Sequence, residues 1–68
     1  GGMNDWVEAH VGRVTELFVS LGASVEQAET MARQLLKRAG QLAHEQGISK
    51  LEATEALLKK VVEARRNG

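Results

Sequence analysis

The middle of the chain constrains the fold most strongly, because apolar residues keep one helical spacing throughout residues 23–46, between two glycines. Apolar side chains recur there every three or four residues, which is the spacing of one face of an α-helix. This stripe consists of Val25, Ala28, Ala32, Leu35, Ala39 and Leu42. Large and small side chains alternate along it, so a neighbouring helix can pack closely. A second stripe of Met31, Leu36 and Ala43 widens the apolar face, and we expect it to pack against two neighbours.

The ends of the predicted helices are marked twice by the same signal. Gly22 and Gly47 are each followed two residues later by a serine, and that serine is followed three residues later by Gln or Glu. Glycine commonly ends a helix in a left-handed conformation, whereas serine with a later Gln or Glu forms a capping box. We expect Asn4 or Asp5 to cap the first helix. The signals predict helices over about residues 5–21, 25–46 and 50–65.

Two glycines lie inside the predicted helices. Gly12 falls within the first helix, where it predicts a close helix crossing, a local bend or a glycine that the fold does not use. Gly40 follows a basic segment that resembles a helix ending, yet the apolar stripe continues through it in phase. We therefore predict one continuous helix, and the alternative is a division into residues 24–39 and 41–46.

The connections between the helices are so short that neighbouring helices must run antiparallel. The sequence therefore predicts an all-α fold, a three-helix up-down-up bundle forming one small domain over residues 1–68. We interpret Gly1 and Gly2 as an expression scar before a natural start at Met3. The expected core consists of Val7, Val11, Val14, Leu17, Phe18, Leu21, Ala28, Ala32, Leu35, Leu36, Ala39, Leu42, Ile48, Leu51, Leu58 and Val61.

A chain of 68 residues can bury only about 60% of its unfolded surface, so additional support is expected. The sequence contains no Cys, which leaves oligomerisation as the common route to greater stability. At about 33 Å, the central helix would be longer than neighbours of about 25 Å. We therefore predict a homodimer formed through this helix, or docking of a partner protein's helix. The candidate interface residues are Trp6, Met31 and Leu57.

The net charge is zero, but the two halves of the chain differ in sign. Residues 1–34 carry two basic and five acidic side chains, whereas residues 35–68 carry seven basic and four acidic ones. Such a chain can pair with itself or with a charged partner, although the same pattern also suits helix dipoles on a solvated surface. No run of about 18 apolar residues and no leader-type opening occurs, so we expect a cytoplasmic protein that does not enter a membrane.

The sequence offers no grouping of side chains that is typical of an active site. His10 and His44 lie on different predicted helices, and neither has another His or Cys three or four residues away, as a helical metal site requires. Two of the three serines are already assigned as helix caps, and the glycines do not follow a phosphate-loop spacing. We therefore expect no enzyme activity, no cofactor, no metal and no small-molecule ligand.

One segment reads Leu42-Ala43-His44-Glu45-Gln46-Gly47-Ile48-Ser49, followed by Ala53, Ala56 and Leu57. Residues 42–57 resemble the helix-turn-helix motif of bacterial repressors, in which a small residue precedes the turn glycine by four positions and an aliphatic residue follows it. Ala43 and Ile48 occupy these two positions. The resemblance implies that the helix from Lys50 would enter the major groove of DNA. The candidate nucleic-acid-binding residues are then Lys50, Thr54 and Lys59.

The leading hypothesis is a small protein–protein interaction or self-association module without catalytic activity. The alternative is a helix-turn-helix-like DNA-binding protein that uses the helix from Lys50. Nucleic acid is not the expected partner, because small DNA-binding domains are usually basic and this chain has no net charge. A helix unbroken through Gly40 would also disfavour the alternative, since the first helix of that motif is short.

Overall fold

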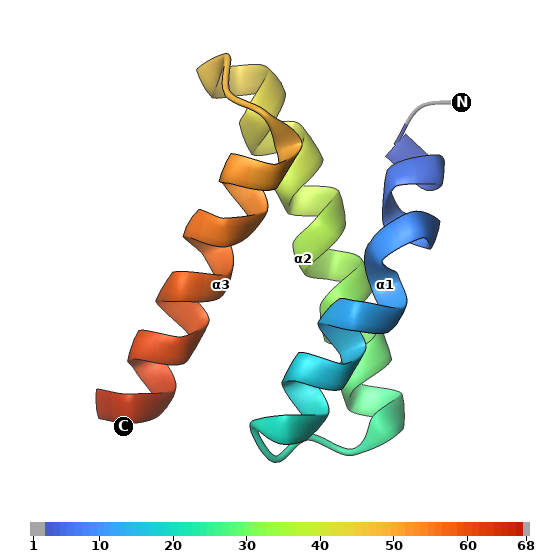
Figure 1. Ribbon diagram of the computed structural model, residues 1–68, viewed down its shortest axis with the longest axis vertical. Helices are drawn as coiled ribbons and strands as arrows, with labels where there is room; N and C mark the ends of the chain where they lie inside the picture. The colour runs from blue at the N-terminus through green and yellow to red at the C-terminus, as the bar shows by residue number, and fades with distance from the viewer. Residues whose placement is uncertain (1–2, 68) are drawn as a thin grey trace.

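The computed structural model describes residues 3–67, which form three α-helices in an antiparallel series (Figure 1). They are α1 (Met3–Ser20), α2 (Val25–Gln46) and α3 (Lys50–Asn67). The described residues contain no strand, so the predicted all-α three-helix bundle is confirmed. The bounds of α2 are the predicted ones, whereas α3 extends two residues beyond the predicted end. The expression-scar interpretation of Gly1 and Gly2 lies outside the described residues.

Serine side chains begin α2 and α3 as the sequence predicts. Ser24 Oγ accepts a hydrogen bond from the Gln27 backbone N–H at 3.2 Å, and Ser24 N–H donates to Gln27 Oε1 at 3.4 Å. This capping box satisfies backbone N–H groups that the first turn of a helix leaves unpaired. At the start of α3, Ser49 Oγ accepts from the Glu52 backbone N–H at 3.0 Å. The prediction for α1 is wrong, because α1 begins at Met3 and Asp5 therefore lies within its first turn.

The two glycines between the helices adopt the left-handed conformation. Gly47 has φ 66° and donates its N–H to the Ala43 carbonyl at the end of α2. Gly22 has φ 111° and donates to the Val19 carbonyl at 3.0 Å. Residues other than glycine rarely adopt these backbone angles. The two glycines therefore fix where α1 and α2 end.

The glycines inside the helices have different surroundings. Gly40 is buried within α2, which runs unbroken through it as predicted. Gly12 is exposed on α1, and a Cβ placed there would meet no atom within 4 Å. Gly12 therefore makes no close helix crossing, and the local bend and the unused glycine are the two predicted alternatives that remain.

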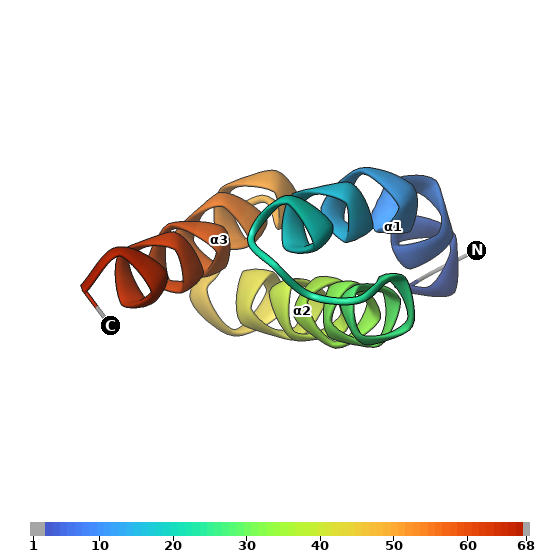
Figure 2. The ribbon, with the colours of Figure 1, turned by 90° about the horizontal axis from the view of Figure 1, so that it is seen from below.

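The helix α2 is the common support of the other two. The backbone of α1 packs against α2, and that of α2 packs against α3, whereas among the described residues the backbones of α1 and α3 are not in contact and the two helices meet through side chains. Seen from below, α1 and α3 lie on the same side of α2 (Figure 2). The radius of gyration is 11.8 Å, slightly above the roughly 11 Å typical of a compact chain of this length. The bundle is therefore partly open.

Two apolar clusters hold the helices together. The first joins α1 to α2 through Val7, Val14, Phe18, Ala28, Ala32 and Leu36, with Leu58 and Val61 of α3 packed at its edge. The second joins α2 to α3 through Ala39, Ala43 and Ala53. Except for Leu36, every buried residue of α2 is Ala or Gly, so both neighbours can approach its backbone closely.

Part of the expected core is placed differently. Leu51, predicted to be buried, is 60% exposed, and Val25 of the predicted stripe is 65% exposed. Ala53 and Thr54 are buried instead. Since a helix turns about 100° per residue, Leu51 lies well away from the face that carries Ala53. Both exposed residues also lie in the first turn of a helix.

Candidate functional site

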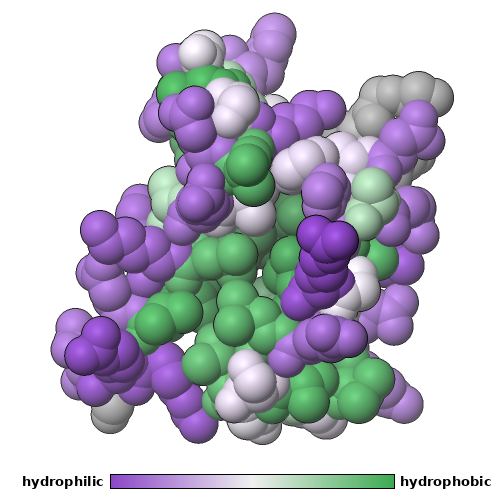
Figure 3. All heavy atoms as spheres, viewed as in Figure 1, coloured by the Kyte–Doolittle hydropathy of each residue, from purple (hydrophilic) through white to green (hydrophobic). Residues whose placement is uncertain are grey.

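A groove lies between the C-terminal half of α3, the C-terminal end of α1 with the turn that follows it, and the middle of α2. It consists of two adjoining hollows that share Phe18, Met31 and Val61. Its apolar lining includes Phe18, Leu21, Met31, Leu35, Leu57 and Val61. Figure 3 shows apolar side chains gathered in the depression between α3 and the lower parts of the other two helices. We call this surface the α3 groove, and we include in it the basic lining residues Arg38, Lys60 and Arg65.

The direction of α3 creates the groove. Near its start, the small side chain of Ala53 packs against Ala39 and Ala43 of α2, so the two backbones lie close together. Farther along, α3 moves away from α2 (Figure 1), and the larger Leu57 and Val61 remain only half-buried. Phe18 is 3% exposed and forms part of the floor, whereas Met31 is 40% exposed. The accessible apolar surface of the groove therefore comes mainly from α2 and α3, and α1 supplies the buried floor.

The charged side chains of the α3 groove have one sign. Arg38, Lys60 and Arg65 line it, and none of the described residues lining these two hollows is acidic. Arg38 also forms an ion pair with Glu45 at 3.5 Å. A third hollow, which also includes Met31, is lined by the acidic Glu26 at the start of α2 and by no basic residue in the described part of the chain.

The three predicted interface residues divide between two places. Met31 and Leu57 line the α3 groove together. Trp6 lies elsewhere, half-buried against the α1–α2 cluster, with its ring centroid 4.1 Å from that of His10. Lys50 Nζ lies 5.8 Å from the centroid of the Trp6 ring, within the range of a cation–π contact. The indole Nε1 of Trp6 is buried and has no hydrogen-bond partner among the described residues.

The predicted nucleic-acid-binding residues do not form one surface. Thr54 is only 6% exposed, and its hydroxyl donates to the Lys50 carbonyl at 2.7 Å. Lys50 is half-buried beside Trp6, whereas Lys59 is exposed. Nine residues separate the two lysines, which places them on opposite sides of α3. The unbroken α2 of 22 residues is also longer than the short first helix of the motif.

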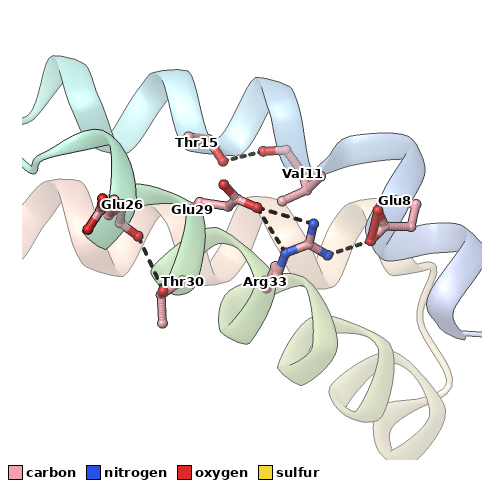
Figure 4. A network of polar contacts seen from close by, with 7 residues as sticks. All are labelled: Glu8, Val11, Thr15, Glu26, Glu29, Thr30 and Arg33. Atoms are coloured by element: carbon pink, nitrogen blue, oxygen red, sulfur yellow. Dashed lines mark hydrogen bonds and ion pairs between the residues drawn. The ribbon is translucent and has the colours of Figure 1, made fainter.

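A polar cluster joins α1 to α2 on the surface. Arg33 of α2 donates to Glu8 of α1 and, at 3.3 Å, to Glu29 one turn earlier in α2 (Figure 4). The hydrogen bond from Arg33 and its positive charge lower the pKa of Glu8, and the same contacts raise the pKa of Arg33. Glu29 and Arg33 have the four-residue spacing of a helical ion pair, whereas Glu8 is a third member that the sequence spacing does not reveal. Because the side chains are 43–61% exposed, these ion pairs connect α1 to α2 at the surface and contribute little to stability.

The sequence contained part of the signal for the α3 groove. The second stripe, which includes Met31, predicted an apolar face wide enough for two neighbours, and the greater length of the central helix predicted apolar surface beyond them. The contribution of Phe18 could not be separated from its core role, because the same ring is buried and also forms the floor. The basic side chains Lys60 and Arg65 appear in sequence as ordinary exposed residues of a helix end.

The described residues contain no group of three or more His, Cys, Asp or Glu side chains that could hold a metal ion. None of the helices is both long enough and apolar enough to cross a membrane, within the part of the chain that the structure describes. Comparison with known proteins found no matching family model, no matching curated protein and no matching solved structure.

Proposed function

We propose that this chain is a small helical interaction module that acts by docking a helix in the α3 groove and has no catalytic activity of its own. The observation that carries this proposal is the groove itself, where apolar side chains of α2, of α3 and of the turn after α1 remain partly accessible above the buried Phe18 of α1. A helix lying there would contact all three helices, and burying its apolar face would be favourable at about 25 cal/mol per Å². The docked helix belongs to a second copy of the chain or to a partner protein, and we expect this to take place in the cytoplasm.

Substitutions at two residues of nearly equal solvent exposure test whether the groove is the docking surface. Met31 and Val19 are 40% and 39% exposed, but only Met31 lines the α3 groove. We expect Met31→Glu to abolish association, because it places a charge in the apolar lining, and we expect Val19→Glu to preserve it. Sedimentation at high micromolar concentration measures association with a second copy, and a clean monomer leaves the partner-helix version. A dimer that survives Met31→Glu would show that the groove is not the docking surface.

The alternative function, DNA binding by a helix-turn-helix-like motif, remains a prediction. It requires side chains of α3 to contact DNA, and Lys59 is the exposed basic candidate among those predicted. Binding to random duplex DNA at about 50 mM and about 200 mM salt tests it, since phosphate contacts weaken steeply over that range. We expect no retention at the lower salt concentration, and retention that disappears at the higher one would favour the alternative.

A further inference from the structure

We propose that the occupant of the α3 groove is an amphipathic helix with acidic side chains along its edges, supplied by a different protein. This inference rests on the proposed docking function and adds the chemistry of the partner. Its basis is the combination of an apolar floor with Arg38, Lys60 and Arg65, and no acidic residue among the described lining of the two hollows.

The positions of the charges match the edges of a docked helix. Phe18 and Met31 form the apolar part of the groove, whereas Arg38 lines it from α2, and Lys60 and Arg65 line it from α3. An amphipathic helix places its apolar residues on one stripe and its polar residues on both flanks. Carboxylates on one flank would approach Lys60 and Arg65 of α3 and those on the other would approach Arg38 of α2, while flanking lysines would be repelled.

Charge also argues against a second copy of this chain as the occupant. The helix α3 has accessible apolar side chains, but it carries five basic residues against three acidic ones. Docking it in a groove with basic edges would bring like charges together. The helix α1 has an acidic excess, three against one, but its apolar residues Val7, Val14 and Phe18 are already buried. Neither helix is therefore a free acidic amphipathic helix.

The test uses two matched, fluorescently labelled peptides of about 18 residues, which form a helix of about 27 Å. Both carry the same leucine stripe, and their flanking positions hold Glu in one peptide and Lys in the other. Fluorescence anisotropy with the full chain at about 50 mM salt should show binding of the acidic peptide alone. Because exposed charges are screened, binding should weaken at about 500 mM salt. Equal binding of both peptides would refute the acidic preference while leaving the apolar docking groove intact.

A pair of double variants locates the interaction. Lys60→Glu with Arg65→Glu reverses two charges of the α3 groove, whereas Lys59→Glu with Arg66→Glu makes the same charge change on exposed residues that do not line it. We expect the first variant to bind the acidic peptide about tenfold more weakly and to prefer the basic one, and the second to bind like the parent. Circular dichroism verifies that both remain helical.

Three results would overturn this inference. If both double variants lose the acidic peptide equally, the effect is one of net charge and not of the groove. If neither peptide binds the parent chain, the partner is not a helix of this chemistry. If the parent is a dimer that Met31→Glu dissociates, a second copy occupies the groove, and the docking function stands with a different occupant.

Discussion

Gly12 and Gly47 both have room for a side chain but differ in backbone conformation. We therefore expect substitution by alanine to change stability in opposite directions at the two positions. A Cβ at either position would meet no atom within 4 Å. Gly12, however, lies in the middle of α1, where glycine costs backbone entropy, whereas Gly47 has φ 66°. The difference between them is therefore one of backbone conformation, and the neighbouring side chains do not contribute.

We expect Gly12→Ala to raise the free energy of unfolding by about 0.5–1 kcal/mol, because alanine restricts the unfolded chain and fits a helix. Gly47→Ala should lower it by about 1–2 kcal/mol, because alanine is strained in the left-handed region. Urea denaturation followed by the fluorescence of Trp6 measures both. A destabilising Gly12→Ala would mean that a neighbour occupies the space beside α1.

Glu8 offers a second test on the scale of a single side chain. The hydrogen bond and charge of Arg33 lower its pKa in the folded chain, so the contact stabilises the fold above the pKa of Glu8 in the unfolded chain. This contribution is lost as the pH falls through the lowered pKa. We expect Arg33→Gln to return the pKa of Glu8 toward its ordinary value in an NMR titration. Arg38→Gln, which removes a different ion pair, should leave the pKa of Glu8 lowered.

On the scale of the helices, α2 depends on small side chains at its two contacts. Ala32 belongs to the cluster with α1 and Ala39 to the cluster with α3, and both are fully buried. Enlarging either residue to Leu should overpack the contact and cost about 1–3 kcal/mol. The same change at the exposed Ala9 of α1 should stay within about 0.5 kcal/mol. If chemical denaturation showed Ala32→Leu to be neutral, α1 would not pack as closely on α2 as the structure indicates.

The helix ends could be predicted from the sequence because local interactions determine them. The rotation of α3 about its axis could not, because it depends on packing against α2. The bounds of α2 were predictable, because Ser24, Gln27 and Gly47 act within a few residues of the helix ends. The exposure of Leu51 was not, because the hydrophobic period places it near the core face of α3 and only the pairing of Ala53 with α2 fixes the rotation of that helix. The α3 groove depends on the same pairing, so its basic edge could not be recognised from spacing alone.

On the scale of the whole molecule, the bundle should be least stable where α3 leaves its neighbours. The last turns of α3 are exposed from Glu63 to Asn67, whereas the middle of α2 has one face buried against both of its neighbours. Local opening requires little free energy where few apolar contacts are lost. We therefore expect native-state hydrogen exchange to be fastest, among helical amides, in residues 60–67 and slowest in residues 32–43.

The same measurement shows whether the α3 groove is a flexible surface that a partner orders. An acidic helical peptide contacting Lys60 and Val61 would join α3 to the other two helices and should slow exchange in residues 57–65. Amides on the exposed face of α1, near Gly12, should be unchanged and serve as an internal control. If residues 60–67 of the free chain exchanged as slowly as the middle of α2, α3 would be held against its neighbours along its whole length. The helices on either side of the groove would then be packed tightly together, and docking a helix there would require α3 to move away first.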